Sequence, residues 1–238
     1  MSLKKAVRRS LKKLSAIGLD INLSLDRGVS VLGLNIARSH HPEAPFAAVA
    51  LKRCLSLSPN SVLDVGSGGG QHAAAFAAIG AKVTCIDFGT SVYAKDATDH
   101  EGVTVVHTDF ALWQSDRQFS LVWASHVLEH QRNVGQFIEK LLSCCAPDGW
   151  IAITVPFPHR RLWGGHVSLW TPGLLVYNVV LCGIDLSAAS LFYGHREISL
   201  VFKPQRATLP PLTYDSGDLN ALANLMPCGF KENADPWL

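Results

Sequence analysis

The chain lacks the features of a disulfide-rich secreted protein and of a membrane-spanning protein. Its 238 residues include six cysteines, but no two of them form a C-x-x-C pair and no regular framework is visible. We therefore expect reduced cysteines, most of them in the core. No apolar run reaches the length of a bilayer span, and the first residues lack the apolar centre of a signal peptide. These absences predict a cytoplasmic protein.

An excess of charge of one sign is also missing from the chain as a whole. The 21 Lys and Arg nearly balance the 19 Asp and Glu, so a general affinity for nucleic acid is not expected. Basic charge is concentrated in residues 1–40, which hold eight Lys or Arg and two Asp. The rest of the chain is consequently acidic on balance.

The glycine fingerprint of nicotinamide-binding proteins is absent too. That fingerprint has the spacing G-x-G-x-x-G, and counting from Gly66 its sixth position is Gln71. Residues 61–70 instead read SVLDVGSGGG. Backbone N–H groups can approach a ligand closely there, because glycine has no Cβ and adopts positive φ at little cost. A buried strand before the glycines and an alanine-rich helix after them would form a cradle for an adenosine-type cofactor.

Two carboxylates accompany the glycine turn. Asp64 precedes the first glycine by two residues, and Asp87 closes the next apolar segment, residues 82–87. The pattern D-x-G-x-G-x-G followed by this second carboxylate resembles the first motif of class I S-adenosylmethionine-dependent methyltransferases. The resemblance implies that Asp64 lies near the methionine amino group of S-adenosylmethionine and that Asp87 accepts hydrogen bonds from both ribose hydroxyls. A glycine-rich turn without a ligand is the alternative.

The resemblance covers residues 61–156, and it implies further cofactor contacts after the later strands. Asp109 would accept a hydrogen bond from the adenine amino group, and Phe110 would pack on the adenine ring. A turn or helix-capping role for Asp109 is the alternative. The expected cofactor-binding residues are Asp64, Gly66, Ser67, Gly68, Gly70, Asp87, Phe88, Asp109, Phe110 and Ser125.

Strands alternate with helices through this region, which predicts an α/β fold with a doubly wound, mostly parallel sheet. By resemblance the sheet has seven strands and ends in a C-terminal antiparallel hairpin. We expect a basic N-terminal helix and connector over 1–41, the methyltransferase domain over 42–203 and a tail packed on it over 204–238. The expected strands are 61–66, 82–87, 103–107, 119–124, 150–155, 185–192 and 198–203, with a turn at 147–149 and helices at 42–57, 72–80, 90–98, 133–145, 173–181 and 218–225.

Residues 1–14, MSLKKAVRRSLKKL, form a basic amphipathic pattern. Four apolar side chains fall on one helical stripe, and six Lys or Arg surround it. One interpretation is a helix that lies on an anionic membrane surface or on a partner. The other is a solvated helix whose apolar stripe covers another part of the same protein.

Histidines are the candidate catalytic residues. Methyl transfer from a sulfonium is an in-line displacement, so the protein has to position the acceptor and remove its proton. A histidine that titrates near neutrality suits a hydroxyl acceptor. His166 comes first, because the loop after the fifth strand lines the acceptor pocket in related enzymes, and His130 and His126 come next. An ordinary surface or hydrogen-bonded histidine is the alternative for each.

The same histidines also suggest a metal. The pattern His126-x-x-Glu129-His130 with a later His166 resembles the E-x-x-E-H…H arrangement of metal-assisted 2′-O-methyltransferases of small RNAs and of some ubiquinone-pathway O-methyltransferases. Here His126 replaces the first glutamate of that pattern, so we expect no metal. The loop over 157–166 carries two arginines and Trp163, which would clamp an anionic or sugar acceptor. A mobile surface loop is the alternative.

The sequence therefore predicts a methyltransferase that uses S-adenosylmethionine to methylate an oxygen of a small molecule, a sugar or a lipid-linked intermediate. Oxygen is favoured because ASHV, rather than an N-P-P-Y-type motif, follows the fourth strand. The alternatives are a metal-assisted RNA 2′-O-methyltransferase and a non-catalytic cofactor-binding protein that docks to a membrane or partner through residues 1–14. The oligomeric state is left open.

Overall fold

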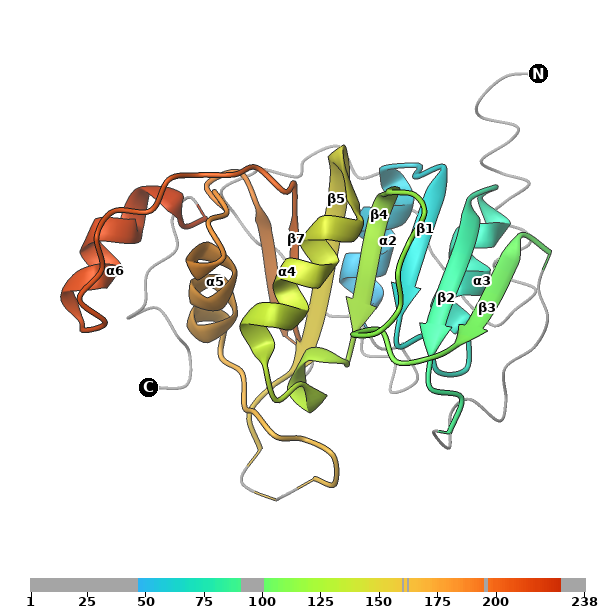
Figure 1. The fold of residues 1–238 in the computed structure, drawn as a ribbon, viewed down its shortest axis with the longest axis horizontal. Helices are drawn as coiled ribbons and strands as arrows, with labels where there is room; N and C mark the ends of the chain where they lie inside the picture. Colours follow the sequence, from blue (N-terminus) through green and yellow to red (C-terminus); the bar gives the residue numbers. More distant parts are fainter. Residues whose placement is uncertain (1–46, 91–100, 160, 162, 195–196, 228–238) are drawn as a thin grey trace.

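The protein is built around one sheet that lies between two layers of helices (Figure 1). The computed structural model describes residues 47–90, 101–159, 161, 163–194 and 197–227. The strand order is β3-β2-β1-β4-β5-β7-β6. The strands are β1 (Ser61–Val65), β2 (Lys82–Asp87), β3 (Val103–His107), β4 (Phe119–Ser125), β5 (Cys145–Pro156), β6 (Ser190–Gly194) and β7 (Glu197–Phe202).

The first five strands are parallel, whereas β7 runs antiparallel to both β5 and β6. The predicted mostly parallel seven-stranded sheet with a C-terminal hairpin is therefore confirmed. The chain proceeds outward from β1 to β3 and then returns to place β4 on the other side of β1. Ligands of open α/β sheets bind at such a reversal, beyond the carboxyl ends of the strands.

Helices α2 (Ala48–Ser56) and α3 (Gln71–Ala78) cover one face of the sheet, and α4 (Val134–Cys144) and α5 (Pro172–Leu181) cover the other (Figure 1). The short helices are η2 (Leu128–His130), α6 (Gly217–Leu222) and η3 (Ala223–Leu225). Each face is sealed by its own apolar cluster, which includes Phe76 of α3 on one side and Ile138 of α4 on the other. Burial of these side chains stabilises the layers.

Local sequence signals explain where the helices begin. The Asn133 side chain accepts a hydrogen bond from Gln136 N, and the Thr171 side chain accepts one from Leu174 N. Both are N-cap contacts, and Pro172 after Thr171 suits the first position of a helix. Helix α3 begins after Gly70, which has a φ of 78°. The glycine turn thus leads directly into a helix N-terminus.

Two predicted strand boundaries were wrong. The turn expected at 147–149 lies within β5, which begins at Cys145, and the pairing of β4 with β5 shifts register between Phe119 and Leu121. The extra residues are absorbed as an irregularity in the ladder. The first hairpin strand begins at Ser190 rather than at 185, since the backbone before it bonds outside the hairpin: Asp185 N donates to the carbonyl oxygen of Gln205, and Leu186 N donates to that of Leu225.

Three predicted elements lie wholly or partly outside the described residues, namely the basic helix over 1–14, the start of the helix expected from 42 and most of the helix expected over 90–98. The five cysteines in the described ranges are free, and four of them are buried, as predicted. None of the helices in the described part of the chain is long and apolar enough to cross a bilayer.

Candidate active site

The glycine turn lies at the carboxyl end of β1. Gly66, Gly68 and Gly70 have φ values of 71°, 52° and 78°, a region that other residues enter only with strain. A Cβ on Gly66 would overlap Cγ2 of Val127, which follows β4. The backbone here is therefore held against the neighbouring strand, and the first N–H groups of α3 face the same edge of the sheet.

Asp87 holds the glycine turn in place. Its Oδ2 accepts a hydrogen bond from Gly68 N at 2.9 Å, and its Oδ1 accepts one from Gly89 N at 2.8 Å. A carboxylate has about four lone-pair sites, so the two contacts that the described residues make leave room for a ligand. The position next to the glycine turn was predicted, but the contacts that shape the turn were not.

Asp64 is a buried carboxylate in β1, with only 2% of its surface exposed. Its Oδ2 has no hydrogen-bond partner among the residues that the structure describes. Burial, and next the charge of Asp87, raise the pKa of Asp64 to about 7. A buried charge of this kind requires a cation or a donor, and the end of β4 adds a second buried group without a described partner, the hydroxyl of Ser125.

The segment after β3 carries the residues that the resemblance assigns to adenine. Asp109 shapes a turn, since its Oδ1 accepts a hydrogen bond from Ala111 N at 2.8 Å and its carbonyl oxygen accepts from Leu112 N and Trp113 N. Phe110 is buried, and its ring packs edge to face on Phe137 of α4. The turn role that the sequence left open for Asp109 is thus present. Phe88, by contrast, is exposed beside Asp87.

Three further polar groups meet just beyond β4. One carboxylate oxygen of Glu129 and one ring nitrogen each of His130 and His166 all lie within 4.8 Å of one another. Glu129 has 1% of its surface exposed, and neither of its carboxylate oxygens has a hydrogen-bond partner in the described ranges. The structure therefore assembles the predicted His130 and His166 around a buried acid.

A loop holds His166 in this cluster. His130 Nδ1 lies 2.8 Å from the carbonyl oxygen of Gly165, and Val167 N donates to the carbonyl oxygen of Glu129 at 2.8 Å. The rings of His130 and His166 meet edge to face with centroids 4.9 Å apart. Partial burial lowers the pKa of His166. The charge of Glu129 acts in the opposite direction, but its effect is smaller than that of burial. His166 is therefore neutral near pH 7, as a base must be.

His126 is placed differently from the other two histidines. Its Nε2 lies 3.0 Å from Oε1 of Glu197 at the start of β7, and its Nδ1 makes a longer contact of 3.4 Å with Oε1 of Glu129. Burial alone would lower its pKa, but the nearby carboxylates of Glu129 and Glu197 outweigh burial and raise the pKa to about 9. His126 is thus a cation near neutral pH, and its φ of 57° is unusual for a residue other than glycine.

Glu197 is the residue that sequence reasoning missed. Its Oε2 accepts a hydrogen bond from Ala47 N at 2.8 Å, so one carboxylate joins the start of α2 to His126. It lies 71 residues from His126 in the chain. No local pattern could have identified it, since only the pairing of β5 with β7 brings it to this edge.

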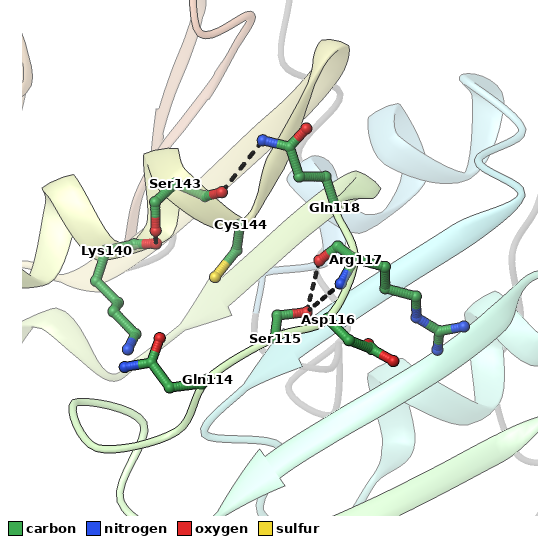
Figure 2. Close-up of a pocket in the computed structure, with 8 residues that line it drawn as sticks. All are labelled: Gln114, Ser115, Asp116, Arg117, Gln118, Lys140, Ser143 and Cys144. Carbon is green, nitrogen blue, oxygen red and sulfur yellow. Dashed lines mark hydrogen bonds between the residues drawn. The ribbon is translucent and has the colours of Figure 1, made fainter.

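A polar pocket of about 610 Å³ lies at the opposite end of the sheet, before β4 and at the end of α4 (Figure 2). Both cationic side chains that line this pocket already donate hydrogen bonds within the protein. Lys140 Nζ donates to the carbonyl oxygen of Trp113, and Arg117 donates to the hydroxyl of Thr84. Figure 2 shows the Arg117 side chain directed away from Lys140. The pocket is therefore not part of the site at the carboxyl edge.

The sheet order, the glycine turn and the acidic strand ends define the Rossmann-like methyltransferase fold. The family model described as a methyltransferase domain matches residues 38–182. The chain belongs to this family, and the class predicted from residues 61–70 is confirmed.

Individual relatives are more distant. A ubiquinone biosynthesis O-methyltransferase from Rickettsia felis is 37% identical over 106 residues, which is 41% of this chain and 42% of the relative. The chain thus spans about two fifths of the length of the curated relatives that it matches.

Solved structures share the fold at low identity. A complex of DhpI with SAM and HEP has a TM-score of 0.54 at 21% identity and covers 66% of this chain and 86% of that one. The 1,6-didemethyltoxoflavin-N1-methyltransferase of Burkholderia thailandensis, with bound 1,6-didemethyltoxoflavin and S-adenosylhomocysteine, has a TM-score of 0.53 at 20% identity and covers 66% and 76%.

The raised pKa of His126 predicts a pH-dependent contribution to stability. A pKa of about 9 in the folded state exceeds the ordinary 6.5, so the stabilisation is complete below about pH 6.5 and is lost as the pH rises through about 9. His126→Gln should lower the free energy of unfolding by about 2 kcal/mol near pH 6 and by much less near pH 9.5. Urea unfolding at both pH values measures this difference. The exposed His107→Gln serves as control, and an equal loss at both pH values would contradict the prediction.

Proposed function

We propose that this protein is an S-adenosylmethionine-dependent methyltransferase that methylates a hydroxyl group of a small molecule. The observation that carries the proposal is the buried carboxylate of Asp64 beside the glycine turn, whose Oδ2 has no hydrogen-bond partner among the described residues. Membership of the methyltransferase-domain family supports it. The curated relatives named O-methyltransferases support an oxygen acceptor.

The residues at the carboxyl edge fit this cofactor. An ammonium group beside Asp64 would satisfy a carboxylate that now has no described partner. The free lone pairs of Asp87 suit a ribose diol, and the glycine backbone leaves room for a ligand to approach. Asp109 and Phe110 border the same edge after β3 and are proposed for the adenine side. A neutral ligand would leave the charge of Asp64 uncompensated.

The histidines suit the acceptor side of the reaction. When bound, S-adenosylmethionine supplies a methyl group on a sulfonium, and the C–O bond forms as the C–S bond breaks. We assign proton removal to His166, whose neutral ring takes the proton of the acceptor hydroxyl. His130 orients His166 through ring contact and is itself held by Gly165. His126 stays protonated and offsets the negative charge of Glu129.

A second candidate function is metal-assisted O-methylation. It is favoured by the cluster of Glu129, His130 and His166, whose ligand atoms lie within 4.8 Å of one another. Two imidazoles suit Zn²⁺ and a carboxylate suits Mn²⁺, so either divalent ion fits this ligand set. A small-molecule acceptor is still preferred to RNA, because the chain outside residues 1–40 is acidic on balance.

Cofactor binding tests the proposal directly. Because a protonated Asp64 cannot pair with an ammonium, the affinity of the wild type for S-adenosylmethionine should rise between about pH 5.5 and pH 7, by up to about tenfold per unit. Asp64→Asn should bind at least about tenfold more weakly near pH 7 and lose this pH dependence. Calorimetry measures both, with the exposed Asp116→Asn as the matched control. Wild-type affinity in Asp64→Asn, or no wild-type binding, would overturn the cofactor assignment.

Catalysis is tested through His166. His166→Ala should reduce kcat about 10²-fold to 10⁴-fold, since a general base contributes that much, while the Kd for S-adenosylmethionine stays within about twofold. Transfer of labelled methyl groups to a panel of sugar and lipid-linked hydroxyls provides the assay, with His107→Gln as control. Full activity in His166→Ala would remove this residue from the reaction. No transfer by the wild type to any hydroxyl, despite cofactor binding, would favour the non-catalytic interpretation.

The metal-assisted candidate makes its own prediction. It requires one Mn²⁺ or Zn²⁺ per chain, bound by the wild type and lost in His130→Ala, because that change removes one of three ligands. Equilibrium dialysis with elemental analysis detects the ion without reference to activity. Wild-type protein that binds no ion and keeps its full rate in a chelator would rule this candidate out.

A further inference from the structure

Glu197 uses both oxygens of its carboxylate to join two segments that are distant in the chain. Its Oε2 accepts a hydrogen bond from Ala47 N, directly before α2, at 2.8 Å. Its Oε1 accepts a hydrogen bond from Nε2 of His126, just beyond β4, at 3.0 Å. Only 16% of the Glu197 side chain is exposed. One largely buried carboxylate therefore holds the start of a helix and the end of a strand together.

Both residues that Glu197 binds have an unusual backbone conformation. Ala47 has a φ of 60° and His126 has a φ of 57°. Among the residues other than glycine in the described part of the chain, Ser58 and Tyr214 alone share this left-handed region. A side chain makes the region unfavourable, and such residues persist where surrounding contacts hold them, most often at active sites. The contacts of Glu197 thus hold two of these four strained residues.

The backbone of His126 is strained for a geometric reason. Ser125 pairs with Thr154 of β5, and the hydroxyl of Thr154 bonds to that of Ser199 in β7 on the same face of the sheet. Glu197 lies two residues before Ser199 in β7, so its side chain lies on this face too. An extended residue after Ser125 would point to the opposite face. The left-handed φ of His126 instead lets its ring reach Glu197 across the end of β5, over about 10 Å between the flanking strands.

The other ring nitrogen of His126 extends this contact into the candidate active site. Nδ1 of His126 lies 3.4 Å from Oε1 of Glu129, the buried acid in the cluster with His130 and His166. On the opposite side, α2 shares one apolar cluster and one face of the sheet with α3, which begins at the glycine turn (Figure 1). The contacts of Glu197 therefore connect the helix layer beside the proposed cofactor site with the proposed acceptor side.

We propose that Glu197 is a positioning residue of the active site. It fixes the ring of His126 against Glu129, and it fixes the start of α2 at the same edge of the sheet. In this way it holds the cluster that contains His166 in one position relative to the cofactor side, as an in-line transfer requires. The proposal rests on the proposed function, since the placement of His166 is what Glu197 serves, and extends that function to a residue outside the cluster.

Kinetics of Glu197 variants test the proposal. Glu197→Ala should lower kcat for methyl transfer to a hydroxyl acceptor by about 10-fold to 10²-fold, because small displacements of a catalytic group are costly, while the Kd for S-adenosylmethionine stays within about twofold. Glu197→Gln should lie between the wild type and Glu197→Ala, because an amide keeps one of the two accepting oxygens. If Glu197→Ala does not fold, Glu197→Gln carries the same comparison.

Asp218 in α6 provides a matched control, because it is a carboxylate of the same kind outside the site. It accepts hydrogen bonds from Thr213 N at 2.9 Å and from Tyr214 N at 2.6 Å, and Tyr214 also has a left-handed φ, of 60°. Asp218→Ala should therefore lower the urea midpoint of unfolding, as Glu197→Ala does. Its kcat should equal that of the wild type at a temperature where both variants are folded.

Histidine ring spectra give a readout that needs no acceptor. In ¹H–¹⁵N spectra at one pH, the ring signals of His130 and His166 should shift in Glu197→Ala but not in Asp218→Ala, because the contact reaches them through His126. His126→Gln should shift the same signals. The kcat of the double variant Glu197→Ala/His126→Gln should be no lower than that of the weaker single variant, since both changes break one contact.

Two results would overturn the proposal. Ring signals of His130 and His166 that stay in place in folded Glu197→Ala would show that the contact does not reach the cluster. A kcat in Glu197→Ala as high as in Asp218→Ala, with the same loss of stability, would reduce Glu197 to a structural role. Calorimetry separates both results from a failure of the proposed function: a wild type that binds no S-adenosylmethionine would overturn that function, whereas the ring spectra would still decide the role of Glu197.

Discussion

Glu129 in η2, just beyond β4, has a carboxylate that is almost completely buried, and the proposed acceptor side of the site depends on how that charge is compensated. A buried, unpaired carboxylate would cost several kcal/mol. The protonated ring of His126 lies 3.4 Å from it, and the rings of His130 and His166 complete its surroundings. The main chain of Glu129 matters as well, because its carbonyl oxygen accepts from Val167 N and thereby holds the loop that carries His166. Glu129 thus contacts the cationic His126 with its side chain and, with its main chain, holds the loop that carries the candidate base His166.

The topology of the sheet brings the cluster of Glu129, His130 and His166 next to the proposed cofactor site. Strands β1 and β4 are neighbours, and Asp64 in β1 pairs in register with Trp123 in β4. The glycine turn after β1 and the Ser125–Glu129 stretch after β4 therefore emerge side by side at one edge. Val127 makes the contact close, since it would collide with any side chain at Gly66. An in-line transfer requires a methyl donor and an acceptor that are held in fixed positions relative to each other, which two adjoining rigid segments can provide.

Much of the cofactor side could be predicted from the sequence, because its determinants are local. A strand, a glycine turn and a helix N-terminus follow one another within residues 61–78, and Asp87 ends the next strand. Less of the proposed acceptor side could be predicted from the sequence. The candidate histidines were recognised by type and position, but their protonation depends on partners that are distant in the chain. His126 illustrates this, since Glu197 converts a candidate base into a cation. The start of β5 was misjudged because Cys145 already pairs with Phe119 of β4, whereas residues 146–149 are the extra residues of a register shift inside the strand.

The sequence by itself determined the class of the fold, the glycine turn and the two acidic strand ends, because apolar periodicity, glycine conformation and short-range spacing act within a few residues. Three features depend on the tertiary structure alone. Oδ2 of Asp64 is buried without a hydrogen-bond partner among the described residues, and Glu129, His130 and His166 form one cluster. Four apolar side chains after β5, within residues 163–174, also remain exposed. Burial and electrostatic environment are properties of the packed molecule, since they depend on every group that surrounds a side chain in space.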